Sequence, residues 1–154
     1  MTAPTEPSAP TGDTVFIASR LFGPLHIPQH ELILMPEGML GFAGERRFVL
    51  LPASAEGIFW FQSADDGTLV FLLVDPFLFF PEYVADAPEV PENRTPDVGA
   101  LTIVTLPRAR GDGCTVNLQG PIVIDFVRRH ARQVIQEDPR YHTRHPIDLR
   151  GKLG

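Results

Sequence analysis

The stretch Leu69-Val70-Phe71-Leu72-Leu73-Val74 contains no polar side chain. Successive side chains of a β-strand point to opposite faces, so a strand with this sequence is apolar on both faces and must be covered on both. It follows Asp65-Asp66-Gly67, and an Asp-Gly pair between two apolar runs is a strong signal for a hairpin turn. The sequence therefore predicts a hairpin whose second strand lies inside the fold.

Other apolar runs of strand length lie on both sides of this one and are separated by Gly, Pro and Asp. They are Thr14–Ala18, Arg20–Ile27, Glu31–Met35, Arg47–Leu51, Ile58–Gln62, Leu101–Leu106, Thr115–Leu118, Ile122–Val127 and Arg132–Gln136. Within one of them, alternation places Val116 and Leu118 on the same face. No segment keeps a helical period, and 16 prolines disfavour long helices. The pattern predicts an all-β domain, either a barrel or a sandwich.

Length and composition fit one domain. The chain has 154 residues, 44% of them hydrophobic, and no apolar run reaches the roughly 18 residues that span a bilayer. Residues 1–13 are rich in Pro, Thr and Ser and are expected to form a disordered tail, and residues 149–154 a flexible C-terminus. The N-terminus has no secretory signal pattern, and a single cysteine excludes an internal disulfide. We therefore expect a cytoplasmic protein with no membrane segment.

Charge is unevenly distributed along the chain. The net charge is −6, but residues 1–100 carry 14 acidic and 4 basic side chains, whereas residues 101–154 carry 5 acidic and 9 basic ones. An acidic protein has no general attraction to phosphate backbones, so direct nucleic-acid binding is disfavoured. The arginines of the C-terminal third are expected to be solvated or paired with acids from the first 100 residues.

Candidate catalytic and metal-binding residues do not form a recognisable pattern. His142 and His145 are three residues apart in a proline-containing segment, and no cysteine cluster completes a zinc site. Cys114 follows a turn and is expected to be a small apolar filler. The glycines Gly38, Gly41 and Gly44 are not followed by the Lys-Ser/Thr of a phosphate-binding loop, and we expect them to let a loop reverse at positive φ. These observations predict neither an enzyme nor a bound cofactor.

The most distinctive segment is Asp75-Pro76-Phe77-Leu78-Phe79-Phe80-Pro81. If it is extended, Phe77 and Phe79 lie on one face and Leu78 and Phe80 on the other. Such a segment is either wholly buried or uses one face to bind a partner. Residues 81–99 follow as a proline-rich loop with five acidic residues, and loops of this length are often functional.

Five motifs resemble those of the FliW family of flagellar assembly factors, and they occur in the family's order over about residues 14–148. Met35-Pro36-Glu37-Gly38-Met39-Leu40-Gly41-Phe42 resembles F-P-E-G-[IL]-P-G-F, and Phe59-Trp60-Phe61-Gln62-Ser63 resembles F-x-W-L-Q-S. Val74-Asp75-Pro76-Phe77-Leu78-Phe79-Phe80-Pro81-Glu82-Tyr83 resembles T-D-P-F-L-F-F-P-D-Y. Val116-Asn117-Leu118-Gln119-Gly120-Pro121-Ile122-Val123-Ile124 resembles V-N-L-x-A-P-I-V-I, and Tyr141-His142-Thr143-Arg144-His145-Pro146 resembles Y-S-T-R-H-P.

The chain departs from the family pattern in three places. Leu40 stands where the family usually has proline, and the hairpin from Phe126 to Arg132 lacks the family's usual glycine. The acidic helical insert that usually follows the position of Tyr83 is short and proline-rich here. If that insert helps to hold a partner, the choice of partner or its affinity differs in this chain.

The resemblance implies a compact, mostly antiparallel β-barrel-like domain over residues 14–148 that acts by binding proteins and has no enzymatic activity. Its implied partners are CsrA, the carbon storage regulator, an RNA-binding dimer that represses flagellin translation, and flagellin itself. The resemblance also implies that the two partners exclude each other, so that free flagellin removes the protein from the regulator and restores repression.

Candidate partner-binding residues lie in two segments. Asp75, Phe77, Phe79, Phe80, Glu82 and Tyr83 form the first group, and alanine at Glu82 and Tyr83 is expected to weaken partner binding without lowering the melting temperature. Arg144 and His145 form either a second contact or hydrogen bonds that hold the C-terminal segment on the barrel. Two other functions stay open: a small-ligand-binding β-barrel for a flavin or metabolite, and a regulator that binds RNA directly.

Overall fold

Strand β6, Val70–Val74, forms where the sequence is apolar on both faces. It pairs with β5, Ile58–Ser63, and with β7, Val98–Thr105, so both of its edges are covered. Leu73 points into one apolar cluster, whereas Leu72 and Val74 belong to another. The prediction of a strand buried on both faces is therefore confirmed. The computed structural model describes residues 13–90, 96–107 and 113–149.

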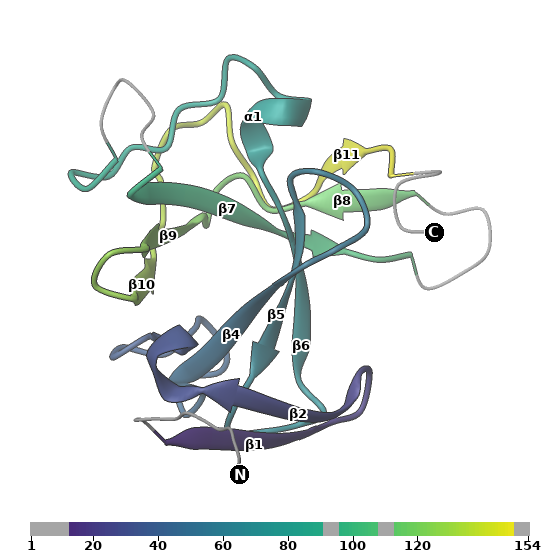
Figure 1. Ribbon diagram of the computed structural model, residues 1–154. Coiled ribbons are helices and arrows are strands. Elements are labelled where there is room, and N and C mark those ends of the chain that lie inside the picture. Colours follow the sequence, from purple (N-terminus) through teal and green to yellow (C-terminus); the bar gives the residue numbers. More distant parts are fainter. Residues whose placement is uncertain (1–12, 91–95, 108–112, 150–154) are drawn as a thin grey trace, which may run out of the picture.

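The sheet that contains β6 closes into a barrel (Figure 1). Beyond β5 come β4, Arg47–Pro52, and β3, Ile33–Leu34; beyond β7 comes β9, Ile122–Asp125, which pairs with β10, His130–Gln133. The ring closes between β3 and β10 through the pair His130↔Leu34, its one parallel junction among the described strands. The prediction of an all-β, mostly antiparallel domain is confirmed, and the barrel replaces the sandwich.

Four further strands lie outside the ring. β8, Cys114–Val116, pairs with β7, and β11, His145–Ile147, pairs with β8; sequence reasoning did not predict β11. β1, Thr14–Ser19, and β2, Gly23–Pro28, form a hairpin that is followed by the short 3₁₀ helix η1, Gln29–Glu31. Ile17 and Ile27 of the hairpin pack against Val49 of the barrel. In Figure 1 the hairpin lies at the lower end of the molecule.

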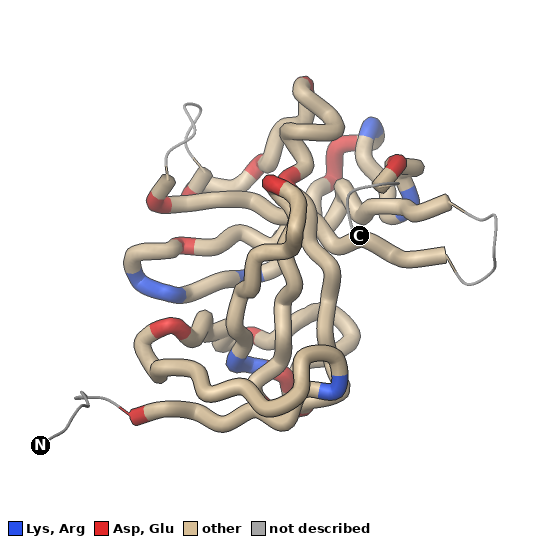
Figure 2. Tube along the Cα trace, turned by 45° about the vertical axis from the view of Figure 1, so that its right-hand side comes forward, with Lys and Arg blue, Asp and Glu red and all other residues tan. Residues whose placement is uncertain are grey.

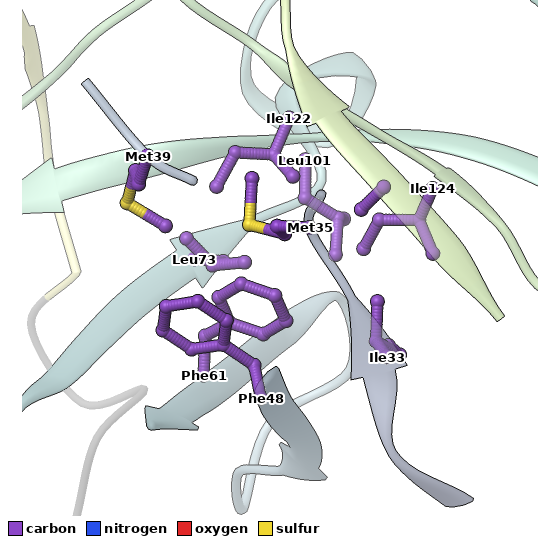
Figure 3. Packing of buried hydrophobic residues seen from close by; sticks show 10 residues of the cluster. Ile33, Met35, Met39, Phe48, Phe61, Leu73, Leu101, Ile122 and Ile124 are labelled. Carbon is purple, nitrogen blue, oxygen red and sulfur yellow. The ribbon is translucent and has the colours of Figure 1, made fainter. Parts of the chain in front are cut away.

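Side chains fill the interior of the barrel (Figure 3). Ten buried residues from the seven strands of the ring and the loop after β3 form this cluster: Ile33, Met35, Met39, Phe48, Phe61, Leu73, Leu101, Ile122, Ile124 and Ala131. The rings of Phe48 and Phe61 are stacked, with centroids 4.4 Å apart and planes 3° from parallel. The barrel interior is thus a packed core, as in small barrels generally, and offers little room for a flavin-sized ligand.

Turns follow the sequence signals in part. Gly38 and Gly41 have φ of +70° and +84°, as predicted, but Gly44 is not in the positive-φ region. Arg129 has a φ of +59°, in the hairpin that lacks the family's usual glycine. In the β5–β6 turn, the Ser63 hydroxyl accepts hydrogen bonds from the Asp65 and Asp66 N–H groups. That turn confirms the predicted hairpin, although it is longer than a two-residue turn.

The ends of the chain are described only in part. The tail predicted over residues 1–13 lies outside the described residues except for Asp13. At the other end Leu149 is buried in the second apolar cluster, and residues 150–154 lie outside the described part. Over the described residues, no helix has the length and apolar character needed to cross a membrane.

Candidate functional site

The segment after β6 is helical, which corrects the expectation that it is extended. Pro76–Phe79 forms the short helix α1, with Pro76 at its first turn. The Asp75 carboxylate accepts a hydrogen bond of 3.0 Å from the Phe77 N–H and so caps the helix. Because the segment turns at Asp75, the alternation argued for Phe77 to Phe80 does not apply. A proline after an N-capping aspartate is the sequence signal that favoured this helix.

A glycine in the β4–β5 turn fixes the position of α1. The Gly57 carbonyl accepts a hydrogen bond of 2.7 Å from the Asp75 N–H. Gly57 has a φ of +79°, and a side chain there would collide with the Leu78 side chain. The helix therefore lies against the backbone of the turn, and Leu78 is left 51% exposed.

The candidate residues of the first group lie in α1 or next to it in the sequence, and they line two hollows. The first hollow, of about 340 Å³, is lined by Asp75, Phe77 and Leu78, together with residues of β4, β5 and β7 and the segment after β9. The second hollow, of about 360 Å³, is lined by Phe79, Phe80, Glu82, Tyr83, Tyr141 and His145, with Arg140 and Leu118. The structure thus brings seven of the eight candidate residues to one end of the barrel.

Aromatic rings form much of the second hollow. The Tyr83 and Tyr141 ring centroids are 4.8 Å apart in an edge-to-face arrangement, and those of Phe80 and His145 are 5.9 Å apart. The Arg140 guanidinium lies 5.1 Å from the centre of the Tyr141 ring and also pairs with Asp138. Such a surface offers aromatic contact together with both signs of charge.

Tyr83 is a core residue, although it lies between exposed ones. It is 4% exposed, and its hydroxyl donates a 2.8 Å hydrogen bond to the Leu118 carbonyl while accepting one from Gln136. The expectation that Tyr83→Ala leaves the melting temperature unchanged is therefore wrong. Burial raises the pKa of Tyr83 above its ordinary value, and the nearby Tyr141 raises it further.

The Tyr83 hydroxyl is expected to make stability sensitive to alkaline pH. The unfolded chain loses this proton near pH 10, but the folded chain retains it, so its contribution is complete below about pH 10 and declines above. Tyr83→Phe is expected to lower the free energy of unfolding by about 1 kcal/mol at pH 8. It should also lose less stability than the wild type between pH 9 and 11.5, as measured by urea unfolding. Equal losses in the two proteins would contradict this assignment.

The acidic loop after α1 is held to the barrel by polar contacts. The Val84 N–H donates to the Tyr141 hydroxyl, the Asp86 N–H donates to the Gln136 side-chain oxygen, and Glu89 pairs with Arg132. The bond from Arg132 lowers the pKa of Glu89, in agreement with the predicted pairing of C-terminal arginines with acids of the first 100 residues. Along residues 82–87 exposed and buried positions alternate. The loop therefore presents Glu82 and Asp86 outward while Tyr83 is buried.

His145 and Arg144 occupy different environments. The His145 Nε2 accepts a 2.9 Å hydrogen bond from the His142 N–H, and the two imidazole rings stack 3.7 Å apart. Burial and the neighbouring His142 lower the pKa of His145. His145 also pairs with Val116 in the sheet, so it holds the C-terminal segment on the barrel. Arg144 is exposed beside it and lines neither hollow.

Reactive chemistry has little support in the described parts of the chain. These parts contain no group of three or more His, Cys, Asp and Glu placed to hold a metal ion. Cys114 packs against the second apolar cluster, and burial raises the pKa of its thiol, which disfavours the reactive thiolate.

Sequence reasoning missed three of the residues that shape the site. Gly57 positions α1, Leu78 is the exposed apolar residue of the helix, and Tyr141 is shared by the second hollow and the acidic loop. Tyr141 begins the motif that runs to Pro146, so the sequence carries a signal for its position. Gly57 lies in an ordinary turn sequence and carried none.

Comparisons with known proteins agree over most of the chain. Residues 16–147 match the family model described as FliW protein. Among curated relatives, the flagellar assembly factor FliW of Heliobacterium modesticaldum is 39% identical over 139 residues, covering 85% of this chain and 89% of the relative. That of Bacillus subtilis is 33% identical, covering 86% and 96%. A crystal structure of the flagellar assembly factor FliW aligns with a TM-score of 0.73 at 32% identity, over 85% of this chain and 95% of that one.

Proposed function

The chain belongs to the FliW family of flagellar assembly factors, and on that premise we propose that it acts in the cytoplasm by binding two client proteins. One is CsrA, whose repression of flagellin translation it relieves. The other is flagellin, for which it serves as a chaperone-like partner during flagellum assembly. The two clients compete, so the amount of free flagellin sets how much regulator is released, by mass action.

The surface around α1 is the observation that supports this proposal. It combines half-buried aromatic rings, the exposed apolar Leu78 and exposed acids at one end of the barrel. Figure 2 shows acidic positions in red among the loops at the upper end, where Figure 1 places α1. Apolar patches with a polar border are typical of protein-binding sites. Acidic charge favours association with a basic, RNA-binding client and makes its rate depend on salt.

Purified proteins test the proposal directly. The wild type is expected to bind CsrA and flagellin separately in calorimetry, and added flagellin is expected to displace CsrA. Glu82→Ala should weaken CsrA binding without changing the melting temperature, because this side chain is exposed. Glu31→Ala is the matched control. Glu31 is also exposed, but it lies in η1 next to the β1–β2 hairpin, so this variant should bind normally. Failure of the wild type to bind either client at micromolar concentration would refute the proposal.

A further inference from the structure

The first hollow, between α1 and the barrel, is apolar and open to solvent. Leu50, Phe59 and Phe126 contribute half-buried apolar side chains, and Leu101 is buried beneath them. Phe77 and Leu78 complete the lining on the α1 side. A volume of about 340 Å³ accommodates one or two large side chains of another molecule. Because it is open, it would leave much of a small ligand in water, whereas ligand pockets usually enclose their ligand.

The charged side chains among the described lining residues of the first hollow are all acidic. Glu56 and Asp75 are among its lining residues, and Asp97 lies between Pro96 and Val98, which also line it. No Lys, Arg or His occurs among its described lining residues. The second hollow differs, because Arg140 and His145 accompany Glu82 there. An occupant of the first hollow therefore gains from positive charge next to an apolar side chain, and an acidic occupant is repelled.

We propose that the first hollow binds a segment of the RNA-binding client, one that inserts a bulky apolar side chain and carries lysine or arginine beside it. This assignment rests on the proposed function. The apolar side chain covers Leu78 and fills the space above Leu101, and the basic side chains lie near Glu56 and Asp97. A protein that binds RNA carries basic surface, which makes it the client that matches this charge.

Two substitutions test the assignment without removing core residues. Leu78→Asp places a carboxylate at the apolar entrance, and Glu56→Lys reverses the charge of the exposed turn. Leu78→Asp is expected to weaken CsrA binding at least tenfold in calorimetry. Glu56→Lys is expected to slow association severalfold at low salt, and less at high salt, where charges are screened. Leu40→Asp, at a leucine that is 67% exposed in the β3–β4 loop, is the control and should bind normally.

The outcomes separate this assignment from the proposed function. If the wild type binds CsrA and both Leu78→Asp and Glu56→Lys bind it equally well, the assignment is overturned while the proposed function stands. If these variants lose flagellin but keep CsrA, the first hollow belongs to the other client and the assignment is also overturned. If the wild type binds neither protein, both are refuted. Circular dichroism establishes that each variant is folded before binding is compared.

Discussion

Gly38→Ala is expected to lower the free energy of unfolding by about 2–5 kcal/mol, from the strain of the left-handed backbone and from overpacking. Gly38 has a φ of +70°, and a side chain there would lie 2.6 Å from the Ala43 Cα and even closer to its carbonyl oxygen. That backbone cannot retreat easily, because hydrogen bonds between Met39 and Phe42 hold the loop closed. Urea unfolding of the variant and the wild type measures the loss.

Gly41→Ala is the matched control for Gly38→Ala. Gly41 also has a positive φ, +84°, but nothing lies within 4 Å of a side chain built there. Gly41→Ala is expected to lower the free energy of unfolding by about 1–2 kcal/mol, from the strain of the left-handed backbone alone. Equal losses of unfolding free energy in the two variants would contradict the overpacking argument, because they would show that the Ala43 backbone moves away from the new side chain at little cost. The comparison therefore separates two requirements for glycine in this loop, the positive φ and the close approach of the Ala43 backbone.

The strands could be predicted because local pattern and burial agree. The run from Leu69 to Val74 is apolar on both faces, and the barrel and the second apolar cluster cover both. Val116 and Leu118 alternate with polar neighbours and are buried, as the alternation predicts. In each case the spacing of apolar residues along the strand matches the strand faces that the fold buries.

The site could be predicted only in part, since contacts between distant segments create it. The aromatic segment was identified, but its backbone is set by the Asp75 cap and by Gly57, which lies 18 residues earlier. Tyr83 looks like its exposed neighbours in sequence, yet its hydroxyl bonds to Leu118, 35 residues away. Strand β11 has only three residues, one of them proline, and it forms because β8 offers an edge. Local sequence carries none of these pairings.

Phe48→Ala is expected to cost about 3–5 kcal/mol, a large part of the roughly 5–15 kcal/mol that stabilises a domain. Phe48 and Phe61 are fully buried, and their stacked rings lie beside Leu73 in the barrel interior (Figure 3). Removing one ring leaves a cavity that neighbouring strands cannot close, because the ring of strands fixes their spacing. Urea unfolding measures the loss, and Phe48→Leu, which retains most of the volume, should lose less.

The pair also predicts coupling between the two positions. If stacking itself contributes, Phe48→Leu and Phe61→Leu together should cost less than the sum of the single losses, by about 0.5–1.5 kcal/mol. Leu40→Ala, at a leucine that is 67% exposed, is the control for removing an apolar side chain and should stay within about 0.5 kcal/mol of the wild type. If the losses of unfolding free energy at the two phenylalanines are additive, stacking contributes nothing. Each ring then stabilises the fold only through the apolar area that it buries.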